Sequence, residues 1–188
     1  MLRYSLVALF AVSSLVSCKI DKKYENKTEP AAVEVEADAT STGKVVVTLN
    51  AIVAEDDSFQ LFYTEDGSLD FNGDFTKVLP VKGKPEAQDI RFVLRDEAAP
   101  SSLRLDIGDN KKQGNIILNT ITVNYNGKSF IIKGGTEFLK YFQSINVGTQ
   151  DVNANSVTLV PKEIDGNYDP MFYPTGDLIN ALKTLLVK

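Results

Sequence analysis

The chain has no histidine and no tryptophan, and its single cysteine is Cys18. Without histidine the chain cannot form a Ser-His-Asp triad or a Cys-His pair. With Cys18 as its only thiol it also cannot form a zinc or copper site from imidazole and thiolate ligands. No disulfide can form within one chain, so stability must come from a hydrophobic core. The net charge of −5 argues against nucleic acid as a partner, because nucleic-acid binding requires a basic surface. These absences predict a non-enzymatic protein without a catalytic cofactor.

The apolar run near the N-terminus, Leu6 to Val12, is short. A membrane span needs roughly 20 apolar residues, so this run is too short to be one. Arg3 precedes it, and small residues follow it up to Ser17. A charged start, a short apolar segment and a small-residue exit are typical of a secretion signal, so we predict that residues 1–17 are a signal peptide.

The segment Leu15-Val16-Ser17-Cys18 resembles the lipobox of bacterial lipoproteins. In that family the signal is cut just before the cysteine, whose thiol and new amino group are then acylated. The resemblance therefore implies a covalent lipid on Cys18 and stable attachment to the outer membrane, since two or more acyl chains hold a protein firmly. It leaves open whether the protein faces the periplasm or the cell surface. The alternative is that Cys18 is a buried or redox-active thiol.

The residues that follow are charged or small and show no helical or strand period. Such a segment cannot bury enough apolar surface to offset the entropy of ordering it. We therefore divide the chain into a signal peptide (1–17), an acylated cysteine with a flexible tether (18–43) and one folded domain (44–188).

The domain carries the pattern of antiparallel sheets. The β-branched, apolar run from Val45 to Val53 predicts a buried strand, and Ser156–Val160 predicts another. Asn126-Gly127 lies between two alternating runs and predicts a two-residue hairpin turn. Apolar and polar residues alternate in three further stretches: 59–63, 90–94 and 103–107. The expected fold is a mainly β, jelly-roll-like antiparallel sandwich.

Two helices are expected beside these strands. Thr136–Gln143 begins with a residue suited to the N-cap and has an acid in its first turn. Residues 177–187 form an amphipathic C-terminal helix whose leucines and isoleucine share one stripe. This stripe either packs on the sandwich, which is the commoner arrangement, or faces a partner.

An acidic turn is a candidate calcium site. Asp66, Asp70, Asn72 and Asp74 offer the oxygen ligands that Ca²⁺ prefers, at alternating positions. Read from Asp70, the spacing begins like a helix-loop-helix calcium loop but then departs from it at Phe75 and Val81. The alternative is an ordinary solvated turn, in which these residue types are expected anyway.

The segment Ile164–Pro174 reads as an irregular, aromatic loop, a credible recognition edge on a rigid scaffold. Its aromatic and acidic side chains could contact a glycan, and the alternative is that they plug one end of the sandwich. The residues concerned are Tyr168, Asp169, Phe172 and Tyr173. A two-carboxylate hydrolase could draw on Asp106, Asp109, Glu163 and Asp165, but solvated surface acids are the better interpretation.

Several stretches, among them Phe59–Asp66, Gln88–Phe92, Leu103–Gly108 and Tyr168-Asp169-Pro170, resemble a domain of uncharacterised Bacteroidota outer-membrane lipoproteins. They are also similar to a jelly-roll sandwich attached to some envelope glycan-handling enzymes. The resemblance implies a lipid-anchored, non-catalytic accessory subunit that binds other envelope proteins in an outer-membrane assembly. The alternative it leaves is a glycan-binding module at the cell envelope.

Overall fold

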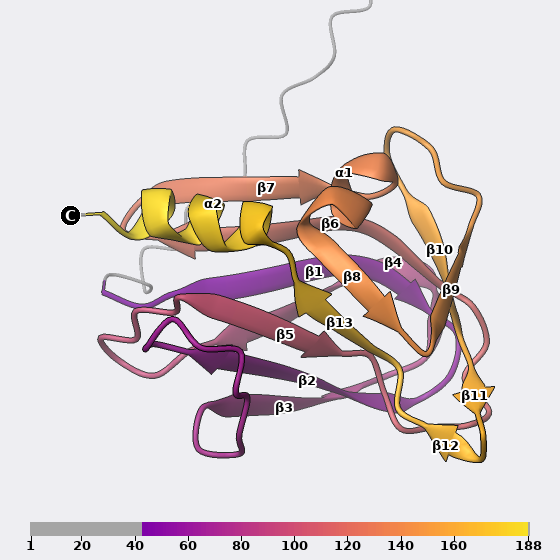
Figure 1. Ribbon diagram of the computed structural model, residues 1–188. Helices are drawn as coiled ribbons and strands as arrows, with labels where there is room; N and C mark the ends of the chain where they lie inside the picture. Colours follow the sequence, from indigo (N-terminus) through magenta and orange to yellow (C-terminus); the bar gives the residue numbers. More distant parts are fainter. Residues whose placement is uncertain (1–42, 188) are drawn as a thin grey trace, which may run out of the picture. The chain divides into compact units, whose positions relative to one another are not determined.

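The computed structural model describes residues 43–187, in which strands dominate (Figure 1). All strand pairs are antiparallel, and six strands form one sheet in the order β4-β1-β6-β10-β9, with β7 also paired to β6. The expected signal peptide, Cys18 and the tether up to residue 42 lie outside the described residues. The strands of this sheet are β1 (Val46–Val53), β4 (Lys84–Val93), β6 (Ile116–Tyr125), β7 (Lys128–Lys133), β9 (Val147–Gln150) and β10 (Val157–Pro161).

A second, five-stranded sheet has the order β3-β2-β5-β13-β8. The chain crosses repeatedly between the two sheets, for example from β1 to β2 and from β5 to β6, as it does in jelly rolls. The expected antiparallel β-sandwich is therefore confirmed. The five strands are β2 (Asp57–Thr64), β3 (Thr76–Val81), β5 (Ser102–Asp106), β8 (Phe142–Ile145) and β13 (Met171–Pro174), and a separate small hairpin joins β11 (Glu163–Ile164) to β12 (Asn167–Tyr168).

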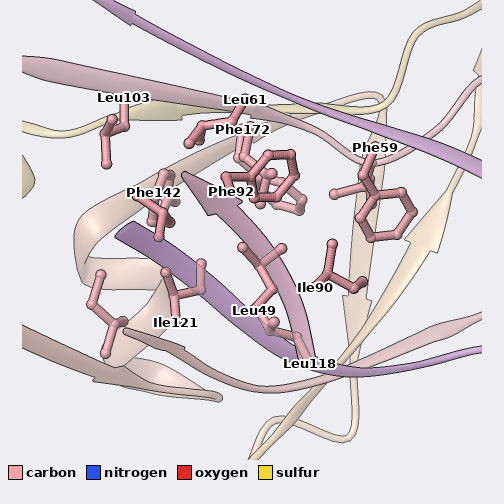
Figure 2. Close-up of a cluster of buried hydrophobic side chains, with 14 of the residues drawn as sticks. Leu49, Phe59, Leu61, Ile90, Phe92, Leu103, Leu118, Ile121, Phe142 and Phe172 are labelled. Atoms are coloured by element: carbon pink, nitrogen blue, oxygen red, sulfur yellow. The ribbon is translucent and has the colours of Figure 1, made fainter. Parts of the chain in front are cut away.

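The core lies between the sheets, where the alternating residues point inward (Figure 2). Phe59, Phe92 and Phe172 are fully buried, and the predicted inward positions of the three alternating stretches are buried as expected. Burying one such large apolar side chain stabilises the fold by about 1.5–3 kcal/mol. In these three stretches, the alternation in the sequence therefore predicts correctly which face of the strand packs into the core.

The Asn126-Gly127 hairpin is confirmed. Asn126 has φ 48° and Gly127 φ 75°, the two positive values that a type I′ turn requires. The backbone N–H of Gly43 donates to Asn126 Oδ1 at 2.8 Å, and Lys128 Nζ donates to the carbonyl oxygen of Val187 at 2.7 Å. The first and last described residues therefore lie at this end of the sandwich, which we call the hairpin end.

The first helix is shorter than the sequence predicts. Helix α1 spans Thr136–Tyr141, and Phe142 already has extended backbone angles because it begins strand β8. The prediction of Thr136 as N-cap is wrong: the cap is Gly135, with φ 78°, and no side chain bonds the helix start. A Cβ at Gly135 would lie 1.6 Å from the carbonyl oxygen of Asn153, so the chain path here requires glycine.

The C-terminal helix α2 spans Gly176–Leu186, close to the predicted range. Its apolar stripe packs on its own domain: Leu178 and Leu182 are fully buried, and Leu185 is 7% exposed. The helix lies beside β7 (Figure 1). The first of the two arrangements expected for this helix is thus the one observed. No helix within residues 43–187 combines the length and apolar character needed to cross a bilayer.

Candidate binding face on the five-stranded sheet

Strand register brings four side chains into one row on the outer face of the five-stranded sheet. Leu103 and Leu105 point into the core, so Arg104 between them points outward. Phe62 pairs with Arg104 across β2 and β5. Phe172 pairs with Leu105, which places Tyr173 opposite Arg104 on the other side. Gln143 pairs with Tyr173 and extends the row onto β8.

Arg104 is held between two aromatic rings. Its guanidinium carbon lies 4.6 Å from the centre of the Phe62 ring and 5.4 Å from that of Tyr173. Its Nε donates to Asp106 Oδ1 at 2.8 Å, and its Nη2 donates to Asp106 Oδ2 at 2.6 Å. Both charged side chains are largely covered, at 15% and 14% exposure. A guanidinium fixed by two bonds and two rings is preorganised, because little side-chain freedom remains to be lost on binding.

Burial and charge act in opposite directions on this pair. Burial raises the pKa of the Asp106 carboxyl, and the neighbouring Arg104 offsets only part of that rise. For Arg104, burial would lower the pKa, but the hydrogen bonds and charge of Asp106 outweigh it, so the pKa of Arg104 is raised. The pair is therefore an almost neutral unit that still exposes polar edges: three N–H groups of Arg104 are not used in bonding Asp106.

A second row runs beside the first. Gln60 and Met171 both pair with Asp106, Val78 pairs with Gln60, and Ile145 pairs with Met171. Val78 and Ile145, on the outer strands β3 and β8, are 53% and 40% exposed. Gln60 Nε2 donates to Thr76 Oγ1 at 2.9 Å, which fixes its amide plane. Polar groups therefore occupy the centre of the face and apolar side chains its flanks.

A third aromatic ring joins the face from a loop. Phe71, in the connection between β2 and β3, meets the Tyr173 ring edge to face with centres 5.6 Å apart. Phe62 and Tyr173 flank Arg104 in the Arg104–Asp106 pair, and Phe71 extends the aromatic surface beyond Tyr173. We call these five residues and Gln60 and Gln143 the aromatic face.

The outer face of the six-stranded sheet carries polar side chains instead of aromatic rings at its centre. Thr48 pairs with Thr122 there, and Asn50 pairs with Asp89 and donates to its Oδ1 at 2.6 Å. Asn119 Nδ2 in turn donates to Asn50 Oδ1 at 2.8 Å. Its central side chains thus bond one another and offer no ring for a ligand, so the aromatic face is the better candidate site.

Strand β13 divides the aromatic segment expected to form one binding loop. Phe172 is fully buried and packs against Phe138 with ring centres 4.9 Å apart, so the prediction that it lies on a binding surface is wrong. The reason is alternation along β13: Tyr173 faces outward beside Arg104, and Asp169 and Met171 share its parity. Two of the four predicted residues, Asp169 and Tyr173, therefore lie on or next to the aromatic face.

Strand β12, which contains Tyr168, lies at the end of the sandwich opposite the hairpin end (Figure 1). There Asp57 Oδ1 accepts the N–H groups of Asp109 at 3.0 Å and Asn110 at 3.2 Å, while Gln113 Nε2 donates to Oδ2 at 2.9 Å. The Tyr168 hydroxyl is buried with no hydrogen-bond partner among residues 43–187. Burial raises the pKa of Tyr168, and the negative charges of Asp57 and Asp109 add to that rise. The buried Tyr168 hydroxyl thus favours the second interpretation of the loop, in which its aromatic side chains plug one end of the sandwich.

The proposed calcium ligands are only partly brought together. Asp66, Asp70 and Asn72 line one open hollow of about 270 Å³, and Asp74 is outside its lining. Asp66 Oδ1 accepts the Ser68 N–H at 3.0 Å, which lowers the pKa of Asp66. Asn72 Oδ1 accepts the Asp74 N–H at 3.0 Å. Within residues 43–187 no three acidic side chains are close enough to hold a metal, and calcium stays a prediction.

The four acids considered for hydrolysis have separate surroundings. Asp106 is bonded to Arg104, Glu163 pairs with Lys111 at 3.1 Å, and Asp165 lies in the turn of the β11–β12 hairpin. Asp109 uses its backbone N–H to bond Asp57. None of these contacts joins two of the four carboxylates.

Comparison of the chain with protein-family models, curated proteins and solved structures found no match. Phe62 and Arg104 are site residues that sequence reasoning missed, and Asp106 was considered only as a hydrolase carboxylate. Phe62 did leave a signal, because it places an aromatic ring at a polar position of an alternating strand.

Proposed function

We propose that this protein is a non-catalytic, glycan-binding module of the bacterial outer membrane, anchored through a lipid on Cys18. The observation that carries the proposal is the row Phe62–Arg104–Tyr173 with Asp106 bonded beside it. Sugar rings pack their C–H faces against aromatic rings, and their hydroxyl groups bond to planar side chains that offer paired donors and acceptors. The aromatic face supplies both.

The charge balance of the aromatic face favours an uncharged ligand such as a neutral glycan. Asp106 neutralises the charge of Arg104, so the guanidinium offers hydrogen bonds more than a net positive field. A phosphate-rich ligand such as nucleic acid would need several unpaired basic side chains, and the net charge of the chain is −5.

An accessory subunit that binds envelope proteins is the second candidate. Its support is the pair of exposed apolar side chains at the flanks of the aromatic face, Val78 and Ile145. The stripe of α2 no longer supports it, because Leu178 and Leu182 are covered by the protein's own domain. The glycan proposal is preferred because the polar centre of the face is fixed and preorganised.

A glycan array probed with the full chain in mild detergent tests the proposal. We expect binding to a defined set of glycans, lost in the double variant Phe62→Ala/Tyr173→Ala. The variant Tyr173→Leu keeps most of the cover over Arg104 but lacks the ring, and it should bind weakly even if the double variant folds poorly. Thr48→Ala/Thr122→Ala on the other sheet is the matched control and should bind normally.

Two results would contradict the proposal. The first is the absence of any glycan binding by a folded protein. The second is co-purification of an envelope protein that is lost with Phe62→Ala/Tyr173→Ala while no glycan binds, which would favour the accessory-subunit role.

The anchor is tested separately. Expressed in a Gram-negative host, the full chain should fractionate with the outer membrane and incorporate labelled fatty acid. Cys18→Ala should abolish both the label and the membrane association. A labelled Cys18→Ala protein would show that the lipid is attached elsewhere.

A further inference from the structure

We infer that the aromatic face selects neutral sugars over acidic ones and that Asp169 determines this selectivity. The inference rests on the proposed glycan-binding function and names the class of sugar that the same site takes. Its basis is the distribution of charge on the face, where one cation is set against two carboxylates.

The Nε–Nη2 edge of Arg104 is closed to an acidic sugar, and the charge on its other N–H groups is offset by Asp106. The carboxylate of a uronic acid would bind best to an unpaired guanidinium, which presents paired N–H groups to planar anions. Asp106 already occupies the Nε–Nη2 edge, at 2.8 and 2.6 Å. Displacing Asp106 would leave a largely buried carboxylate without its partner, which is strongly unfavourable.

Asp169 supplies the second negative charge. It lies two residues before Met171, on the same parity as Met171 and Tyr173, and the pairing of β13 with β5 continues to the neighbouring Pro170, whose carbonyl accepts the Ile107 N–H at 3.0 Å. Its charge is close enough to raise the pKa of both Arg104 and Asp106. Among residues 43–187 no ion pair to Asp169 is found, so its charge is not cancelled locally.

The summed charge at the centre of the face is therefore negative. An acidic glycan lying on Phe62 and Tyr173 would bring its carboxylates next to Asp169, whereas the hydroxyl groups of a neutral glycan can donate to it. Asp169 thus combines an acceptor for neutral sugars with repulsion of acidic ones. The ring and amide contacts on either side are common to both classes of ligand.

Affinity electrophoresis of the full chain in gels containing a neutral or an acidic polysaccharide tests the inference. The probes are soluble mannan, glucan and galactan against polygalacturonate, at low and at high salt. We expect retardation by at least one neutral polymer and little by polygalacturonate. Asp169→Asn should strengthen polygalacturonate binding by about five-fold, the effect of one surface charge, and should change neutral binding little.

Asp165→Asn is the matched control, because it removes one acidic charge from the exposed β11–β12 turn. It should leave the ratio of neutral to acidic binding unchanged. The gain of Asp169→Asn should shrink at high salt, since exposed charges are screened. Equal binding of polygalacturonate and neutral polymers by the wild-type chain, or equal effects of Asp169→Asn and Asp165→Asn, would overturn the selectivity while glycan binding stands. Absence of binding to every polymer would overturn the glycan-binding function itself.

Discussion

Phe62 and Arg104 face each other across β2 and β5, with the guanidinium carbon 4.6 Å from the ring centre. A similar contact occurs near the hairpin end, where Arg95 lies 4.6 Å from the ring centre of Phe75 and pairs with Glu65. The difference is exposure: the side chain of Arg95 is 52% exposed and that of Arg104 is 15% exposed. The largely buried contact between Phe62 and Arg104 is the one that strand pairing fixes, and the proposed binding site is built around it.

Phe172→Ala and Tyr173→Ala should have opposite consequences, although the residues are adjacent. Phe172→Ala removes a fully buried ring and should lower the free energy of unfolding by about 3–5 kcal/mol. Tyr173→Ala should cost only about 1 kcal/mol, since it loses a half-buried ring and its contact with Arg104. Urea unfolding of the two variants measures both values. Similar losses would contradict the assignment of the two side chains to opposite faces of β13.

Leu182→Ala tests the packing of α2. The side chain is fully buried in the core, so we expect a loss of about 2–5 kcal/mol in the free energy of unfolding. Lys183→Ala, on the exposed side of the same helix, should change stability by less than about 0.5 kcal/mol. Thermal and urea unfolding both report this difference. A neutral Leu182→Ala would indicate that α2 is free to offer its stripe to a partner.

Gly108→Ala should be much more damaging than Gly67→Ala. Gly108 and Gly67 have positive φ values of 113° and 82°, so each substitution should lower the free energy of unfolding by about 1–2 kcal/mol through backbone strain. At Gly67 a Cβ would meet nothing within 4 Å, whereas at Gly108 it would lie 2.2 Å from Asp57 Oδ2. We expect Gly108→Ala to cost about a further 1–3 kcal/mol as the Asp57 hydrogen bonds are lost. Equal effects in urea unfolding would show that the Asp57 network contributes little.

Asp56 gives a pH-dependent prediction. Bonds from Lys82 Nζ at 2.6 Å and the Gly83 N–H at 2.8 Å lower the pKa of Asp56 below its ordinary value of 3.8. Between the two pKa values the unfolded chain binds more protons, so this contribution to stability is complete above pH 3.8 and lost as pH falls through the lowered pKa. Asp56→Asn should therefore show a smaller drop in unfolding temperature on acidification. Lys82→Gln should act in the same direction, and an unchanged drop in both variants would contradict this role.

The strands that the sequence predicts are mostly those with one wet and one buried face, whereas β3, β8 and β9 were not predicted. Leu103 and Leu105 indicate which side of β5 faces the core, and Asn126-Gly127 predicts the turn that joins β6 to β7. The segment Ile164–Pro174 was harder, since it reads as a loop but contains part of a hairpin and all of β13. Asp165-Gly166 has the positive φ values of a hairpin turn, 52° and 80°, and is the sequence signal that this interpretation missed.

The aromatic face could not be derived from the sequence, because its residues come from separate strands and their register is set by the whole sheet. In the sequence Arg104 and Asp106 look like ordinary solvated positions of an alternating strand. Only the pairing of β2 and β13 on either side of β5 covers them with Phe62 and Tyr173. Phe172 shows the same limit of the sequence, because its neighbours in the chain do not reveal on which side of β13 the core lies.

The most direct test of the account is a nuclear magnetic resonance titration of the ¹⁵N-labelled chain with a neutral glycan selected on the array. The Nε–H of Arg104 donates to Asp106 and should give a resolved side-chain signal. We predict that this signal and the amides of Phe62 and Tyr173 shift on titration, while the amides of Thr48 and Thr122 on the other sheet do not. Shifts confined to Thr48 and Thr122, or to the Tyr168 end of the sandwich, would contradict the aromatic face as the glycan-binding site.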